Sequence, residues 1–100
     1  MKVLVTGHKG FIGSHVFDFL SDIFDVDGLD SSIMPATGTP EPGGLFWDET
    51  LNIIKIAAKN SNIVGADINE LAPIKGFNSY NFLVAKLAYK ILSYIYLYKN

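Results

Sequence analysis

Short apolar runs and longer amphipathic stretches alternate along the chain. Apolar positions recur at helical spacing in three segments, which are Phe11 to about Ser21, Leu45–Lys59 and the C-terminal tail. Before each helical segment lies a short apolar run typical of a buried strand. The three expected strands are Lys2–Thr6, about Phe24–Gly28 and Asn62–Asp67. The pattern predicts an α/β fold: a small three-stranded parallel sheet in the order β-α-β-α-β-α, flanked by helices.

The C-terminal tail, YNFLVAKLAYKILSYIYLYKN, is apolar enough to raise the question of a membrane segment. Lys86 and Lys90 lie one helical turn apart in its middle, where lysines are costly in lipid. We therefore expect no membrane span but a helix that turns one apolar face to the core. That face comprises Leu83, Leu87, Ile91, Tyr94 and Tyr98. In the preceding helix the corresponding face comprises Trp47, Leu51, Ile54 and Ala58.

The composition limits the class of protein. With 100 residues, 49% of them hydrophobic and 18% charged, the chain suits one folded domain with a modest core. A net charge of −2 without a basic run gives no indication of a nucleic-acid partner. The absence of cysteine excludes disulfides, thiolate nucleophiles and cysteine-ligated zinc. The opening apolar run is too short for a signal peptide, so we expect a cytoplasmic protein.

Three glycines follow the first expected strand at regular spacing. Gly7, Gly10 and Gly13 lie between that strand and the first helix, in VLVTGHKGFIGSHVFDFL. Such a turn lets backbone N–H groups approach a pyrophosphate at the N-terminus of the helix. A turn kept only for close packing of strand against helix would use the same glycines. Asp30 closes the second strand, near where a carboxylate could meet an adenosine ribose.

Residues 1–30 resemble the start of the extended short-chain dehydrogenase/reductases, especially the NAD-dependent epimerases and dehydratases, which open with TGxxGFIGS. The resemblance implies NAD(P) as a cofactor, with Gly7, Gly10, Gly13 and Asp30 as its binding residues. That family's catalytic Tyr-x-x-x-Lys pair is missing, because no tyrosine here has a lysine four positions on. We therefore expect weak NAD(H) binding at most, and no oxidoreductase or epimerase catalysis.

A second motif, DVDGLDSSIMPATGTPEPGG, begins inside the second strand. Asp25 and Asp27 are two residues apart, so on a strand their side chains would point to the same face, beyond its carboxyl end. A solvated acidic strand end would give the same pattern. IVGADINELAP and FLVAKLAYKIL follow in order, and together these stretches, over about residues 24–97, resemble the C-terminal part of the ureohydrolases, the arginase/agmatinase family. The TGTPEPGGL segment is most similar to agmatinase-like members.

This second resemblance implies a metal site. Asp25 and Asp27 would be ligands of a pair of Mn²⁺ ions, which carboxylate oxygens suit. The ions would turn a bridging water into hydroxide, which attacks the guanidinium carbon of a substrate such as agmatine and releases urea. Glu70 occupies the position of the family's substrate-binding glutamate. Within this family Asp30 fits a structural turn residue better than a ligand.

The chain also departs from the ureohydrolase pattern. The family's upstream histidine and Asp-x-His-x-Asp motif have no counterpart, and Ile23 and Ser31 replace a serine and a proline. We interpret residues 1–23 as an epimerase-like βα unit that continues into a ureohydrolase C-terminal-like segment, 24–100, in a single domain. Three hypotheses stay open. They are an agmatinase-like fragment that is inactive alone, an NAD(P)-binding module, and a non-catalytic α/β domain.

The two resemblances also bear on the arrangement of the sheet. Both families place the second strand beside one of the other two, so we expect it in the centre. Sheets in both families are larger than three strands, so an exposed sheet edge and an apolar face should remain. This predicts a homo-oligomer, or association through that edge.

Overall fold

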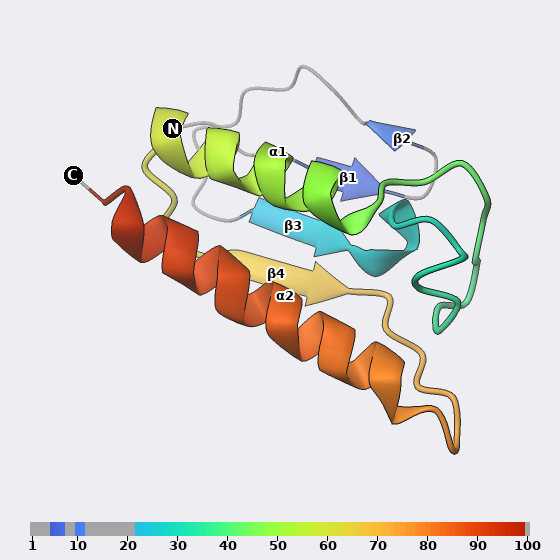
Figure 1. The fold of residues 1–100 in the computed structure, drawn as a ribbon. Helices are drawn as coiled ribbons and strands as arrows, with labels where there is room; N and C mark the ends of the chain where they lie inside the picture. The colour runs from blue at the N-terminus through green and yellow to red at the C-terminus, as the bar shows by residue number, and fades with distance from the viewer. Residues whose placement is uncertain (1–4, 8–9, 12–21, 100) are drawn as a thin grey trace.

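The computed structural model describes residues 5–7, 10–11 and 22–99, which form one sheet with helices packed against it (Figure 1). Three of its strands run parallel in the order β1-β3-β4, so that β3 is central, and β2 pairs antiparallel with β1 at the edge. The strands are β1 Val5–Gly7, β2 Gly10–Phe11, β3 Asp22–Asp25 and β4 Ala66–Asn69. The expected α/β class and the central second strand are therefore confirmed.

The structure corrects the sequence prediction at three places in the sheet. The third expected strand is Ala66–Asn69 and not Asn62–Asp67, so it begins four residues later. Gly7 of β1 pairs antiparallel with Gly10 of β2, and Phe11 lies in β2 where a helix was expected to begin. The rest of that expected helix, residues 12–21, lies outside the described part of the chain. The second strand is shorter than expected, because after Asp25 the backbone turns into the 3₁₀ helix η1, Val26–Gly28.

Helix α1, Trp47–Asn60, has a hydrogen bond across its first turn and a favourable charge distribution. The backbone N–H of Phe46 donates to Glu49 Oε1 at 3.2 Å, and acidic residues in the first turn and Lys59 in the last suit the helix dipole. Ile54 and Ala58 are buried, as the helical spacing predicted. The expected inner face of this helix is thus confirmed.

Helix α2, Asn78–Leu97, lies beside α1 on the same face of the sheet (Figure 1). Leu87 and Ile91 are buried on its inner side, again as predicted. Lys55 of α1 lies over the ring of Tyr94 of α2, with Nζ 5.5 Å from the ring centre. Among the described residues, no helix is long and apolar enough to cross a membrane.

One hydrophobic core joins both helices, β3 and the long loop that follows η1. The loop is part of this core, because Met34 and Ala36 are fully buried in it. The buried members are Phe24, Val26, Leu29, Met34, Ala36, Ile54, Leu87 and Ile91. The loop of residues 31–44 is therefore held by packing as well as by hydrogen bonds.

Candidate metal and substrate site

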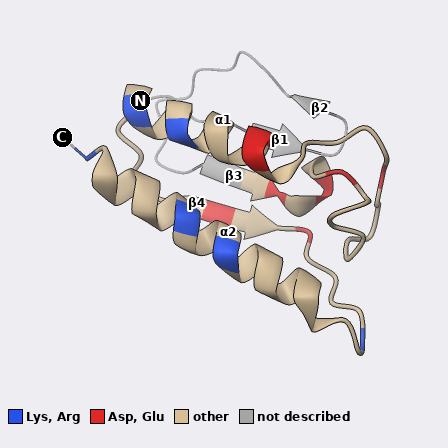
Figure 2. Ribbon diagram, in the orientation of Figure 1, with Lys and Arg blue, Asp and Glu red and all other residues tan. Residues whose placement is uncertain are grey.

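The carboxyl ends of β3 and β4 meet at the same edge of the sheet. In their parallel register Asp25 pairs with Asn69, and Glu70 follows directly. This edge of a parallel sheet is where α/β proteins usually bind ligands. Acidic residues gather toward it in Figure 2, and most of the lysines lie on the helices. The fold thus brings the predicted metal-binding and substrate-binding carboxylates to one end of the sheet.

Asp25 and Asp27 do not both lie on a strand, which corrects the geometric argument made from their spacing. Asp25 is the last residue of β3, whereas Asp27 lies within η1. Asp27 is buried, and the hydroxyl of Thr39 donates to its Oδ2 at 2.9 Å. The hydrogen bond fixes one carboxylate oxygen of Asp27 from across the loop.

Asp30 organises the loop of residues 31–44. Its Oδ2 accepts hydrogen bonds from both the hydroxyl and the backbone N–H of Ser32, the latter at 2.9 Å. Its Oδ1 accepts from the backbone N–H groups of Gly43 at 2.7 Å and Gly44 at 3.1 Å. The Ser32 side chain above all, then the Ser32, Gly44 and Gly43 amides, lower the pKa of Asp30 to about 2, against the raising effect of burial. These contacts favour a structural role, while the expected ribose contact stays a prediction.

Gly44 lets the end of the loop run against the backbone that follows η1. Leu45 and Leu29 form an isolated parallel β-bridge. Its two hydrogen bonds run from Leu45 N to Gly28 O at 3.0 Å and from Asp30 N to Leu45 O at 2.9 Å. A Cβ on Gly44 would lie 2.5 Å from Asp30 N and 2.6 Å from the carbonyl carbon of Leu29. Only glycine fits at this position, so the second glycine of the motif's Gly-Gly pair has a direct steric reason.

Glu70 has a strained backbone. Its φ of 71° is the only positive value of a non-glycine residue in the described part of the chain. Such a conformation is costly for a residue with a side chain and is found disproportionately at functional sites. The Glu70 side chain is exposed, at the point where the chain leaves β4. Two residues on, the backbone N–H of Ala72 donates to Ala36 O at 2.8 Å, which ties this segment to the loop.

The predicted nucleotide-binding turn is described only in part. Gly7 and Gly10 form an antiparallel pair between β1 and β2, and Gly13 lies outside the described residues. A dinucleotide-binding turn leads from a strand directly into a helix, whereas here it leads into a second strand. The NAD(P) role of these glycines gains no geometric support and stays a prediction.

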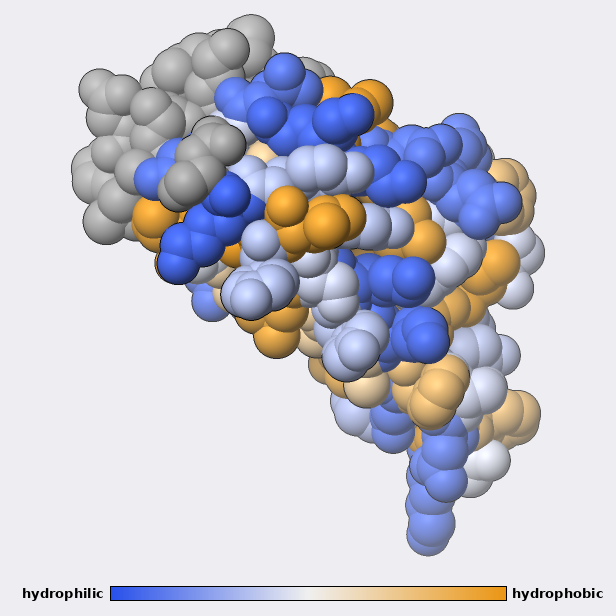
Figure 3. Space-filling model, turned by 60° about the vertical axis from the view of Figure 1, so that its left-hand side comes forward, coloured by the Kyte–Doolittle hydropathy of each residue, from blue (hydrophilic) through white to orange (hydrophobic). Residues whose placement is uncertain are grey.

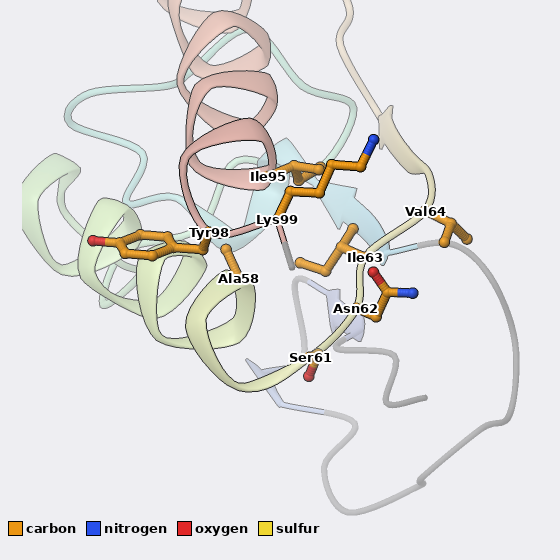
Figure 4. A pocket seen from close by; sticks show the side chains of 8 residues that line it. All are labelled: Ala58, Ser61, Asn62, Ile63, Val64, Ile95, Tyr98 and Lys99. Atoms are coloured by element: carbon orange, nitrogen blue, oxygen red, sulfur yellow. The ribbon is translucent and has the colours of Figure 1, made fainter.

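One cavity in the described part of the chain lies away from the carboxylates. It has a volume of about 440 Å³ and opens where the chain enters β4 and where α2 ends (Figure 4). Its lining comprises Ala58, Ser61, Asn62, Ile63, Val64, Ile95, Tyr98 and Lys99. It carries no carboxylate and contributes nothing to the site at the other end of the strands.

The described residues provide only part of a metal site. Oxygen ligands such as those of Asp25 and Asp27 suit a hard cation like Mn²⁺. However, no group of three or more His, Cys, Asp or Glu side chains lies close enough to hold a metal ion within residues 5–7, 10–11 and 22–99. Further ligands from elsewhere would be required for tight binding.

The role of Thr39 was not predicted from the sequence. Threonine is common in loops, and Thr39 lies twelve positions after Asp27, so the sequence alone does not reveal the contact between them. The available signal was the TGTPEPGG stretch itself, in which a hydroxyl follows the acidic pair within a glycine- and proline-rich loop. In metal sites, residues that do not touch the metal themselves commonly hold its carboxylate ligands in place through hydrogen bonds.

Comparison with known proteins identifies the family to which this fold and motif correspond. The family model described as "Arginase family" matches residues 19–93. The chain belongs to the arginase family. The matched range includes every carboxylate of the site just described.

Several members of the arginase family are similar to this chain over part of their length. The N(1)-aminopropylagmatine ureohydrolase of Synechocystis is 47% identical over 70% of this chain and 23% of its own length. The agmatinase of Pyrococcus horikoshii is 37% identical over 91% of this chain and 38% of its own. The solved structure of proclavaminate amidino hydrolase from Streptomyces clavuligerus has a TM-score of 0.67, 28% identity, and coverage of 75% of this chain and 26% of that chain.

The sequence suggested that an epimerase-like unit, residues 1–23, continues into a ureohydrolase-like segment, and these matches test that interpretation. The chain spans less than two fifths of the length of each of these arginase-family relatives. The alignment with the Pyrococcus agmatinase covers so much of the chain that it includes part of residues 1–23. The ureohydrolase resemblance is therefore confirmed, and these relatives give no support to the epimerase resemblance. The division of the chain after residue 23 stays a prediction.

Proposed function

We propose that this chain carries part of an agmatinase-like, manganese-dependent ureohydrolase centre, with Asp25 and Asp27 as metal ligands and Glu70 as the group that binds a guanidinium. The observation that supports this proposal most directly is the register of β3 and β4. It pairs Asp25 with Asn69, and Glu70 is the next residue after Asn69. Membership of the arginase family and the names of the agmatinase relatives support the substrate class.

The chain's own residues would have separate tasks in such a centre. Asp25 and Asp27 would offer carboxylate oxygens, and Thr39 would hold Asp27 in one orientation through its hydrogen bond. The exposed carboxylate of Glu70 would pair with the planar guanidinium of agmatine or a related compound. A bound pair of Mn²⁺ ions would supply a hydroxide nucleophile at neutral pH.

We expect this chain by itself to bind Mn²⁺ weakly and to release no urea. Two carboxylates hold a divalent ion poorly, because affinity depends on ligand number and pre-organisation. Binding a substrate through Glu70 without an aligned nucleophile would not accelerate its hydrolysis. The activity would require ligands that the described residues do not provide.

A manganese titration followed by electron paramagnetic resonance tests the metal part. The double substitution Asp25→Asn with Asp27→Asn should abolish the weak binding, because it removes both charged ligands. Glu41→Gln with Asp48→Asn is the matched control, since both residues are exposed carboxylates outside the site. Equal loss in the two double variants, or no binding by the original chain, would refute the proposed site.

A urea assay with agmatine and excess Mn²⁺ tests the catalytic part. The original chain and the Asp25→Asn, Asp27→Asn variant should both give the background rate. Turnover that disappears in the variant would keep the assigned ligands but contradict the expected inactivity of this chain alone.

A further inference from the structure

Helix α2 has a second apolar face, opposite the one that it buries. Five residues at alternating spacings of three and four are all exposed: Phe82, Ala85, Tyr89, Leu92 and Tyr96. This is the seam of a heptad repeat, with Phe82, Tyr89 and Tyr96 at one type of position and Ala85 and Leu92 at the other. Exposed apolar residues scattered singly need no explanation, but a continuous seam along most of a helix does.

The exposed seam is large enough to form an interface. The exposed fractions are 70% for Phe82, 67% for Tyr89, 66% for Leu92 and 83% for Tyr96. At roughly 200 Å² for an aromatic side chain, these residues expose about 500 Å² in each chain. Two such faces would bury at most about 1,000 Å² together, which is the threshold at which a predicted interface is accepted as a biological one.

We infer that α2 is a dimerisation surface and that its partner is the α2 helix of a second copy of this chain. The heptad seam is self-complementary, because the same spacing on two helices gives interlocking layers. An apolar hollow of about 230 Å³ lies beside Leu92 and extends the surface toward Val64 and Ile68. Apolar residues also reach the surface between polar ones on the face drawn in Figure 3.

We take the pair to be antiparallel, because the dipoles of two antiparallel helices attract each other, whereas those of two parallel helices repel. Lys86 borders the seam, and α2 contains no acidic residue that could neutralise it. In an antiparallel pair Ala85 packs against the partner's Tyr96 and Tyr89 against the partner's Leu92. The two Lys86 residues are then about 13 Å apart along the axis at 1.5 Å per residue.

This inference is independent of the proposed metal site. Antiparallel packing of α2 against α2 uses the outer helix face, whereas the carboxylates lie at the carboxyl end of the strands (Figures 1 and 2). A substitution in the seam should therefore weaken the dimer and leave Mn²⁺ binding unchanged. Substitution of Asp25 and Asp27 should weaken Mn²⁺ binding and leave the dimer unchanged.

Sedimentation equilibrium over a wide dilution range tests the dimer. The chain should show reversible monomer–dimer behaviour, and Leu92→Glu should weaken association about tenfold or more, because it puts a charge at the centre of the seam. Ile56→Glu is the matched control, since Ile56 is 60% exposed but lies on α1. A monomer at every concentration, or equal weakening by both substitutions, would overturn the inference.

Cysteine cross-linking tests the orientation, because the chain has no cysteine of its own. A mixture of the Ala85→Cys and Tyr96→Cys variants should form the mixed disulfide faster than Ala85→Cys forms a disulfide with itself. The opposite preference would refute the antiparallel arrangement.

Discussion

Gly44→Ala should destabilise the chain strongly, because the new methyl group would clash with neighbouring backbone atoms. Its Cβ would lie 2.5 Å from Asp30 N, 2.6 Å from the carbonyl carbon of Leu29 and 2.8 Å from Asp30 Cα. All three neighbours are backbone atoms, so no side chain can rotate to make room. Forcing them apart would also weaken the hydrogen bond from Gly44 N to Asp30 Oδ1.

The expected cost is about 3 kcal/mol. Overpacking typically costs about 1–3 kcal/mol, and a weakened hydrogen bond to a charged group adds to that cost. In urea-induced unfolding the midpoint should fall by about 1 M or more, given the usual denaturant dependence of small domains. Circular dichroism at 222 nm follows the loss of α1 and α2 during this transition.

Two further glycines provide graded controls within the same loop. A methyl group on Gly38 would have no heavy atom within 4 Å, and Gly38 has no positive φ, so Gly38→Ala should change stability by less than about 0.5 kcal/mol. Gly43 also has open space but a φ of +81°, so Gly43→Ala should cost about 1 kcal/mol through backbone strain alone. If Gly44→Ala proves as stable as Gly38→Ala, the close approach of this segment to Asp30 is wrong.

Two other predictions concern the carboxylates. Because the pKa of Asp30 is lowered to about 2 in the folded state, its ionised form contributes stability above the ordinary pKa near 4, and that contribution is lost as pH falls from about 4 toward 2. The free energy of unfolding should therefore fall more steeply over this range in the original chain than in Asp30→Asn, and parallel curves would contradict this. Thr39→Val should weaken Mn²⁺ binding about tenfold, because Asp27 loses the donor to its Oδ2, and Thr39→Ser should restore it. Weakening by both substitutions in the same titration would show that the hydroxyl is not the relevant group.

Helical positions could be predicted from the sequence because their burial follows a local period. Ile54 and Ala58 in α1, and Leu87 and Ile91 in α2, are buried as their spacing indicated. The end of β3 could not be predicted in this way. Val26 is buried in η1 by contacts with distant segments, and an apolar residue there is equally compatible with a strand.

The residues of the candidate site stay a prediction, and their local geometry could not be predicted from the sequence. The order of the motifs indicated where Asp25, Asp27 and Glu70 belong, and the family membership supports that order. The hydrogen bonds that shape the site join residues far apart in sequence, such as Thr39 with Asp27 and Gly44 with Asp30. Neither spacing nor propensity encodes such contacts, and the positive φ of Glu70 is equally invisible to them.

The burial of Met34 and Ala36 has a consequence for the motion of the loop that contains them. A loop fixed only by surface hydrogen bonds can open while the rest of a domain stays folded. Here, opening residues 31–44 would expose two members of the core and release the four donors on Asp30. The amide hydrogens of Gly43 and Gly44 should therefore exchange with solvent only as fast as the whole core unfolds. If the proposed function holds, residues 31–44 would form a fixed border beside the carboxylates that does not open separately from the core.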